Sequence, residues 1–332
     1  MIKKFIDTKE NDMFSLFRGL DLQELLFQIE TYYLEYRNSL NLPEYVTIGI
    51  EIEYENIKKS KTDEYIENNL SNWCSKTDGS LSSGGEITSP IMIDSPKYWD
   101  ELKIVCDYLS LNHANMSCNA GGHIHIGSNV LGEDVEAWKI FLKLYMCYEN
   151  VLFRFLYGDK VNGRKNLLNY ARPTADILYN KLGFINNAYR VGDFNDLTYE
   201  YERYLALNLG NVNWYDPYDD DYKNTIEFRS PNATTEATIV QNNINALCKL
   251  LIVARDKIID EEFLDYKIKH DFRPYSGNEY LYSTVNLKNV LEFVDLTFDN
   301  NLDKVYFLRQ YLKDFEEIYK SSDSQKAKRF VR

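Results

Sequence analysis

Hydrophobic residues recur along this chain with two different periods, one typical of helices and one typical of strands. Strict alternation of apolar and polar residues predicts strands, and spacings of three and four predict helices with an apolar stripe. Alternating segments lie at 46–54, 85–91, 122–127 and 224–230. Helical patterns cover most of the first forty residues and 95–111, 133–157, 235–258, 286–298 and 301–319. This order predicts an α+β fold with an antiparallel sheet and helices packed on one face.

The residues that begin and end these segments indicate how the chain is organised. Asp21 and Glu24 form a capping-box pattern at the start of the first helical stretch, and Pro43 marks its end. Ser95 and Pro96 suit the N-cap and the first turn of the next helix. No internal repeat and no linker rich in glycine, serine or proline divides the sequence. We expect a helical extension over 1–42, a main domain over 43–260, and a helical region over 261–332 packed on it.

Two segments between the predicted elements are expected to be irregular. The stretch 158–200 is rich in loop-forming residues and carries local positive charge. The stretch 213–222 is acidic and aromatic, which is typical of a hairpin tip or a loop in solvent.

Composition narrows the classes of function. Hydrophobic residues make up 44% of the 332 residues, enough for a buried core. Lysine and arginine number 38 against 51 aspartates and glutamates, so the formal net charge is −13. Such acidity argues against non-specific binding to nucleic acid or to an anionic membrane. The sequence has no apolar run of eighteen residues, no signal-peptide pattern, and five cysteines without a CxxC pair. We therefore expect a cytoplasmic protein with reduced thiols and no membrane span.

Polar residues occupy one side of three predicted strands. In chain order these are Glu51 and Glu53, then His123 and His125, then Thr225, Glu227 and Arg229. Two carboxylates roughly 7 Å apart on one strand face repel each other unless a cation lies between them. Glycines flank the two histidines and permit close approach of a backbone or a ligand. Taken alone, the first and third patterns favour a solvated strand face over a binding site.

Considered together, the three polar faces and Glu86 of the 85–91 segment suit a metal ion. Carboxylates combined with an imidazole favour Mg²⁺ or Mn²⁺ over zinc. An arginine beside such ions suits a phosphate. The sequence contains neither a P-loop nor a GxGxxG pattern, so a nucleotide would be held by metals on the sheet. The residues thus predict a metal–phosphate site on a concave antiparallel sheet and leave the reaction open.

Five short motifs occur in an order that identifies a family resemblance. They are Gly49-Ile-Glu-Ile-Glu, Asp78-Gly-Ser-Leu, Gly85-Glu-Ile-Thr-Ser-Pro, Gly122-His-Ile-His-Ile-Gly and Thr225-Ile-Glu-Phe-Arg. In this order they resemble the amidoligase family of carboxylate–amine ligases, which shares the glutamine synthetase catalytic fold with the glutamate–cysteine ligases. The resemblance covers about 49 to 232, over half of the chain. It implies a curved antiparallel sheet of the glutamine synthetase type.

The resemblance also implies a role for individual residues. The expected metal ligands are Glu51, Glu53, Glu86, His123 and Glu227. His125 would face the nucleotide phosphates, and Arg229 would neutralise the γ-phosphate during transfer. Asp78 would lie near the amine substrate or a metal, and joins Arg229 and Glu86 in the expected catalytic set. Contacts with nucleotide or substrate are implied for Arg164, Tyr170, Arg203 and Asn208.

The reaction implied by the resemblance uses ATP together with Mg²⁺ or Mn²⁺. Transfer of the γ-phosphoryl group activates a carboxylate as an acyl phosphate, and an amine then attacks to give an amide, ADP and phosphate. The expected substrates are small-molecule or peptide carboxylates and amines, which the sequence does not identify further.

Three alternatives remain at this point. Some guanidino phosphotransferases share this sheet architecture, and a noncatalytic module could bind nucleotides or peptides. A metallohydrolase would need three or four imidazole or cysteine ligands. The two other histidines, His113 and His270, have no ligand-like spacing.

Overall fold

One six-stranded antiparallel sheet forms the centre of the fold, with strands in the order β2-β3-β1-β4-β6-β5. The computed structural model describes residues 29, 32–79, 81, 83–116, 120–156, 167–197, 204–216, 223–276 and 284–312. The strands are β1 (Ile48–Glu55), β2 (Cys74–Lys76), β3 (Gly84–Thr88), β4 (Gly122–Gly127), β5 (Leu207–Asn208) and β6 (Thr225–Phe228). The predicted α+β class and antiparallel sheet are confirmed.

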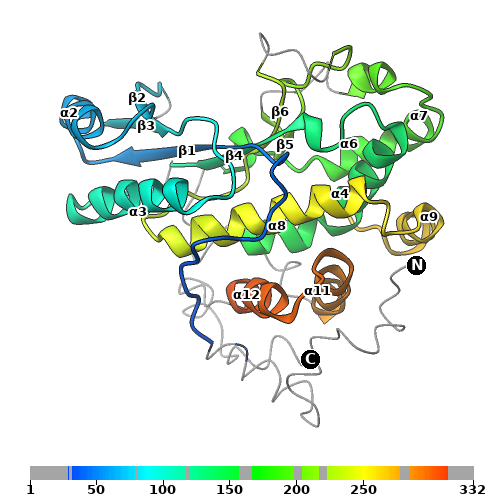
Figure 1. The fold of residues 1–332 in the computed structure, drawn as a ribbon. Coiled ribbons are helices and arrows are strands. Elements are labelled where there is room, and N and C mark those ends of the chain that lie inside the picture. The colour runs from blue at the N-terminus through cyan, green and yellow to red at the C-terminus, as the bar shows by residue number, and fades with distance from the viewer. Residues whose placement is uncertain are drawn as a thin grey trace.

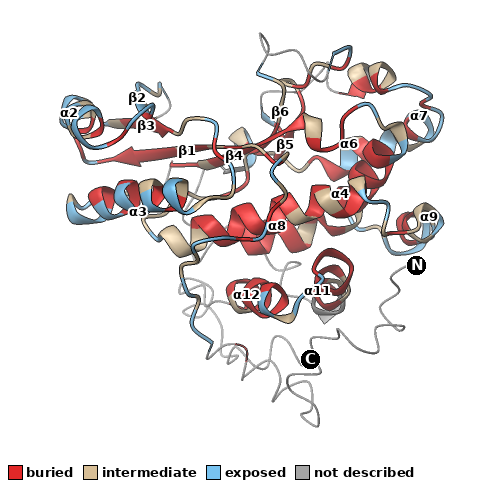
Figure 2. Ribbon diagram, in the orientation of Figure 1, coloured by how far each residue is buried: buried red, intermediate tan, exposed pale blue. Residues whose placement is uncertain are grey.

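Alternation of side chains gives the sheet one apolar face. The apolar residues of β1, such as Ile50 and Ile52, are 1–2% exposed. On β6, the ring of Phe228 contacts Phe141 and Tyr145 of helix α4 (Val135–Leu156). Helices α3 (Pro96–Leu111) and α8 (Ala237–Arg255) run along the same side of the sheet (Figure 1). Burial is concentrated where these helices meet the sheet and one another (Figure 2).

The remaining helices surround this central layer. The helices are α2 (Lys59–Asn69), α5 (Leu167–Tyr170), α6 (Ala175–Asn180), α7 (Leu182–Asn186), α9 (Glu261–Asp271), α11 (Thr284–Thr297) and α12 (Asn301–Tyr311). Short 3-10 turns, η2 (Ser128–Val130) and η3 (Val191–Leu197), lie between them. Helices α11 and α12 pack against α4 and α8, and form a further layer on the side away from the sheet (Figure 1). The domain boundaries after residues 42 and 260 stay predictions.

The helix predicted for the N-terminal forty residues is wrong over 32–42. Residues 1–28 lie outside the described residues, but 32–42 is extended chain that runs along α8 and α12. The Arg37 backbone N–H donates to Gln241 Oε1 at 2.9 Å, and Gln241 Nε2 donates back to the Arg37 carbonyl at 2.7 Å. The Arg37 guanidinium also pairs with Asp303 at 2.7 Å. These backbone groups are thus satisfied by a neighbouring helix instead of by a helical turn of their own.

Several polar or short elements have no clear signal in the sequence. Helix α2 buries only Thr62 and Ile66 along its length, so its apolar stripe is too thin to produce a clear period. Strands β2 and β5 have three and two residues. Helix α9 was not predicted, and the stretch expected to be loop contains α5, α6, α7 and η3. Residues 217–222 of the acidic segment 213–222 lie outside the described part of the chain. The same holds for residues 313–319 of the helix expected over 301–319.

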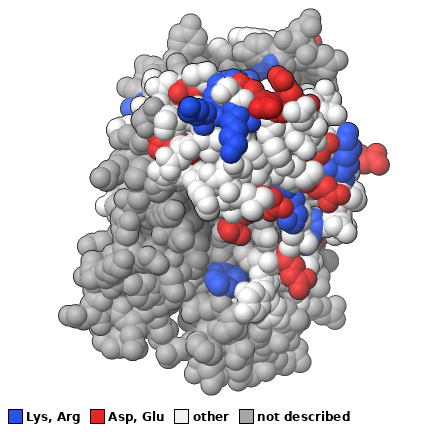
Figure 3. Space-filling view, turned by 90° about the vertical axis from the view of Figure 1, so that its left-hand side faces the viewer, with Lys and Arg blue, Asp and Glu red and all other residues white. Residues whose placement is uncertain are grey.

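Charges of both signs alternate on the described surface at the end of the sheet that carries α2 (Figure 3). Lys59 pairs with Asp63 at 2.8 Å on α2, and Lys103 pairs with Asp107 at 2.6 Å on α3. Exposed pairs of this kind contribute little to stability. They provide control positions for tests of charged residues elsewhere.

Candidate functional site

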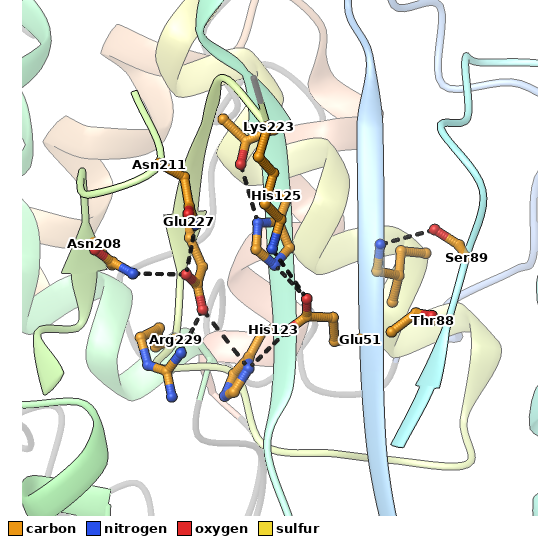
Figure 4. A network of polar contacts seen from close by, with 12 residues as sticks. Glu51, Thr88, Ser89, His123, His125, Asn208, Asn211, Lys223, Glu227 and Arg229 are labelled. Carbon is orange, nitrogen blue, oxygen red and sulfur yellow. Dashed lines mark hydrogen bonds and ion pairs between the residues drawn. The ribbon is translucent and has the colours of Figure 1, made fainter. Parts of the chain in front are cut away.

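Strand register brings the polar residues of four strands together on the face opposite the helices. Glu51 of β1 lies opposite His123 of β4, and His125 lies opposite Glu227 of β6. On the other side of β1, Glu53 lies opposite Glu86 of β3. Directly opposed residues of antiparallel strands have Cβ atoms about 5 Å apart. Side chains from four different strands therefore meet on one face, and Figure 4 shows the part of it formed by β1, β4 and β6.

These polar side chains are buried almost as deeply as the apolar core. Glu53, His123, His125 and Glu227 are 3–4% exposed. A buried charge is unfavourable unless it is paired with an opposite charge, hydrogen bonded, or bound to a metal. The partners of each group therefore indicate what the site is built to hold.

The first cluster consists of Glu51, His125 and Glu227. One ligand atom from each lies within 4.8 Å of the other two. His125 Nε2 is 3.1 Å from Glu51 Oε1, and His125 Nδ1 lies 3.2 Å from the hydroxyl of Thr225. The Glu227 carboxylate accepts hydrogen bonds from the Arg229 guanidinium and, at 2.7 Å, from Asn208 Nδ2.

The second cluster consists of Glu53, Asp78 and Glu86, whose ligand atoms also lie within 4.8 Å of one another. Glu53 Oε2 accepts the backbone N–H of Gly121 at 2.6 Å. His123 lies between the clusters, with Nδ1 at 3.2 Å from Glu51 Oε2 and Nε2 at 3.8 Å from Glu53 Oε1. Because a carboxylate only accepts, Nδ1 carries the proton, and in the neutral ring Nε2 keeps its lone pair.

The pKa values of the carboxyl groups follow from these contacts. Burial alone would raise the pKa of Glu51, but hydrogen bonds from His123 and His125 hold that pKa far below its usual value. For Glu227, burial is outweighed by the charges of His125 and Arg229, and the pKa is lowered. Burial, followed by the charges of Glu51 and Glu53, raises the pKa of Glu86 to about 7. Two carboxylates are thus held charged, while the third titrates near neutral pH.

The donor set fits hard divalent cations. Both clusters are rich in carboxylate oxygens, which Mg²⁺ and Mn²⁺ prefer, and each has an imidazole within reach. His123 Nε2 is buried and has no hydrogen-bond partner among the described residues, whereas His125 Nε2 faces Glu51 Oε1 at 3.1 Å. A buried nitrogen lone pair without a partner is unfavourable in a closed core and suits a metal ligand. Glu51, His125 and Glu227 would hold one ion, Glu53, Asp78 and Glu86 a second, and His123 faces both.

Short elements at the edge of the sheet position Asn208 beside Glu227. The backbone N–H of Leu207 donates to Thr174 Oγ1 at 3.0 Å. The Thr174 N–H in turn donates to the buried carboxylate of Glu149 on α4 at 2.6 Å. Burial raises the pKa of Glu149 to about 8, although hydrogen bonds from Thr174 and Ala175 oppose the change. A chain of hydrogen bonds from α4 thereby fixes β5 against β6.

Glycines around the site permit close packing of the backbone. A Cβ atom on Gly122 would lie 2.9 Å from the carbonyl oxygen of Asn232. On Gly49, opposite His125, it would lie 3.4 Å from the His125 Cβ, an ordinary van der Waals contact. Gly122 therefore admits another segment of the chain.

Most of the residues predicted for the site lie close together in the structure. Arg229 donates through Nε to the carbonyl oxygen of Tyr170 at 3.1 Å, which brings Tyr170 to the edge of the first cluster. Asn208 and Asp78 each join one of the clusters. Arg164 and Arg203 lie outside the described residues. The assignment of His123 to the metal and His125 to the phosphates stays a prediction, since both imidazoles face carboxylates.

Two further residues reach the first cluster. Asn211 Nδ2 donates to Glu227 Oε2 at 3.3 Å, and Lys223 Nζ lies 3.3 Å from Glu51 Oε1 (Figure 4). Nothing in the sequence marks Asn211. Lys223 precedes the Thr225, Glu227 and Arg229 series by two residues, a spacing that could have suggested it.

Helix α8 is the single helix of the described residues with the length and composition to cross a membrane. In the protein 78% of its apolar window is buried, and a core helix meets the same criteria.

No protein-family model and no curated protein matches the chain.

Proposed function

We propose that this protein is an ATP-dependent carboxylate–amine ligase of the amidoligase type. The observation that carries the proposal is the meeting of Glu51, His125 and Glu227 on one sheet face, with Arg229 bound to Glu227. These residues come from three of the five motifs that resemble the amidoligases. The agreement between motif order and a single shared site supports a common chemistry.

The same reasoning leads us to propose that the sheet is of the glutamine synthetase type. An antiparallel sheet with helices on one face and a carboxylate-rich polar face on the other is what such a fold requires. In this proposal Glu51, His125 and Glu227 hold one divalent ion, and Glu53 and Glu86 hold the second with Asp78. His123 lies within reach of both. Bound Mg²⁺ or Mn²⁺ would supply charge neutralisation for the nucleotide phosphates.

Residues at the two ends of the site have complementary roles in the proposal. Arg229 lies at the edge of the first cluster, where its guanidinium would neutralise charge on the transferred phosphoryl group. Tyr170, Asn208, Arg164 and Arg203 are proposed contacts for nucleotide or substrate. Asp78 and Glu86 lie at the other end, where a carboxylate would orient the amine and take up its proton.

The proposed reaction is balanced in two steps. A substrate carboxylate oxygen attacks the γ-phosphorus of ATP, the bond to the β-phosphate oxygen breaks, and ADP leaves. The amine nitrogen then attacks the acyl carbon, phosphate leaves, and the nitrogen gives up a proton. A carboxylate alone is a poor acyl donor because oxide would have to leave, and phosphorylation removes this barrier. The protein contributes mainly positioning and charge.

The proposal is tested first by ligand-dependent stability, which needs no knowledge of the substrate. Thermal unfolding is measured with ATP or ADP, with and without Mg²⁺ or Mn²⁺, for the wild type, Glu227→Gln and the exposed control Glu67→Gln. A ligand at 100 times its Kd stabilises by about 2.7 kcal/mol. We expect metal-dependent stabilisation of the wild type and the control, and its loss in Glu227→Gln. Failure of every nucleotide and metal combination to stabilise the wild type would favour a different kind of binding module.

The reaction type is tested on pools of carboxylates and amines. We expect ADP, phosphate and an amide in equal amounts. ADP formed together with a phosphorylated guanidino compound, and without amide, would favour the phosphotransferase alternative.

A further inference from the structure

Lys223 is a largely exposed cation in contact with the first cluster. Its side chain is 52% exposed, whereas those of Glu51, Arg229 and Glu227 are 16%, 16% and 4% exposed. Its ammonium lies 3.3 Å from Glu51 Oε1, the oxygen that also faces His125 Nε2 at 3.1 Å. Lys223 therefore contacts Glu51, which is more exposed than Glu227, and its side chain is drawn beside the first cluster in Figure 4.

The base of Lys223 is fixed although its side chain extends into solvent. The next residue, Asn224, has a φ of 45° and accepts the backbone N–H of Ser128 at 3.0 Å. The N–H of Thr225 donates to the carbonyl of Asn211 at 3.1 Å. A lysine carries four methylene groups between its backbone and its ammonium, and these rotate freely in solvent. The ammonium can therefore move by several ångströms while the backbone stays in place.

A divalent ion and the ammonium compete for Glu51. Both are cations, and an ion held by Glu51, His125 and Glu227 would lie within a few ångströms of the ammonium position. At that separation the two cations repel each other, and solvent around the exposed ammonium weakens but does not remove this repulsion. Ion binding therefore favours a Lys223 ammonium that has left Glu51. An anionic group that enters from solvent along with the ion would offer the released ammonium a new partner.

We propose that Lys223 is a mobile cation of this site, which pairs with Glu51 in the metal-free protein and moves to the phosphates of the nucleotide once the metal is bound. This inference rests on the proposed function, because it takes the anionic ligand to be a nucleotide polyphosphate. It assigns two opposing effects to one side chain. The ammonium weakens metal binding to the empty site and strengthens nucleotide binding to the loaded one.

The test measures the two affinities separately on the full-length protein. Mn²⁺ binding to metal-free protein and binding of the β,γ-imido analogue of ATP at saturating Mn²⁺ are measured by calorimetry. The variants are Lys223→Gln, Lys223→Arg and the control Lys103→Gln, which removes an exposed pair on α3.

Opposite changes in the two affinities are expected for Lys223→Gln. Its Kd for Mn²⁺ falls about fivefold, because an exposed ion pair no longer competes. Its Kd for the nucleotide analogue rises about tenfold, because a charge-assisted hydrogen bond is lost. Lys223→Arg keeps both wild-type values, Lys103→Gln changes neither, and both effects shrink at high salt.

Two results would overturn the inference while leaving the proposed function intact. One is unchanged Mn²⁺ affinity in Lys223→Gln, and the other is a change of both affinities in the same direction. If the wild type binds neither Mn²⁺ nor the nucleotide analogue, the proposed function and this inference fail together.

Discussion

Replacing Glu86 by glutamine should stabilise the metal-free protein at pH 8. Glu86 is partly buried opposite Glu53, and its pKa is raised from the usual 4.5 to about 7. A carboxyl group whose pKa is higher in the folded than in the unfolded chain favours folding when protonated. The unfolded chain therefore loses its proton first as pH rises. Wild-type stability should fall between about pH 4.5 and 7 and then level off.

The size of the effect follows from the same values. A difference of one pKa unit between folded and unfolded chain corresponds to about 1.36 kcal/mol. The change from 4.5 to about 7 therefore sets an upper bound of about 3 kcal/mol. Because the Glu86 carboxyl is only partly buried, solvent screening reduces this to about 1–2 kcal/mol. Glutamine has nearly the same shape without the charge, so its stability should lack this dependence on pH.

The assay is urea unfolding in the presence of a chelator at several pH values from 4.5 to 8.5, for wild type, Glu86→Gln and Glu67→Gln. We expect Glu86→Gln and wild type to unfold alike near pH 4.5, and Glu86→Gln to be more stable by about 1–2 kcal/mol at pH 8. Glu67→Gln, on the exposed side of α2, should show no such trend. With saturating Mn²⁺ the order should reverse, because the wild type gains more binding free energy. A Glu86→Gln protein less stable than wild type at pH 8 without metal would show that the charged Glu86 carboxylate does not destabilise the folded protein.

Three further changes test the framework around the site. Asn208→Ala removes the 2.7 Å hydrogen bond to Glu227. It should weaken Mn²⁺ binding, measured by calorimetry, about tenfold while the fold persists. Unchanged affinity for Mn²⁺ would show that this hydrogen bond does not orient Glu227 for the metal. Phe228→Ala empties a fully buried ring site against Phe141 and should lower the free energy of unfolding in urea by about 3–5 kcal/mol; a loss below about 1 kcal/mol would show that the sheet and α4 are not packed as described. Gln241→Leu leaves the Arg37 backbone groups unpaired, so hydrogen exchange at 35–40 should become faster while exchange in β1 stays the same.

Local sequence pattern predicted the elements in which period and length were both clear. Strand β4 and helix α4 lie within a residue or two of their predicted ranges. Strict alternation and a long apolar stripe are local patterns, so they predict these elements independently of the rest of the chain. The segment 32–42 shows the opposite case. Its tyrosines occur at helical spacing, but Tyr33 is 87% exposed, and the backbone pairs with Gln241 on α8. Tertiary hydrogen bonds there outweighed a weak local preference.

The sequence predicted on which side of each strand the candidate site residues lie. Alternation alone puts Glu51 with Glu53 and His123 with His125 on the polar sides of their strands, and the structure keeps them there. Asn211 was missed because it lies in a turn without periodicity, and it reaches Glu227 only through the fold.

Which side chains share a face follows from the local sequence, because the period of a strand is a local property of the chain. Which faces meet, and in what register, depends on the packing of the whole fold. His123 and Glu51 are 72 residues apart in sequence, and Lys223 and Glu51 are 172 apart, yet each pair lies within 3.3 Å. Such pairings depend on the packing of the whole sheet against α4 and α8, where a slip of one residue would turn the carboxylates and imidazoles toward the apolar core. Short motifs thus identify most residues of the site, while the geometry of the site depends on the assembled sheet.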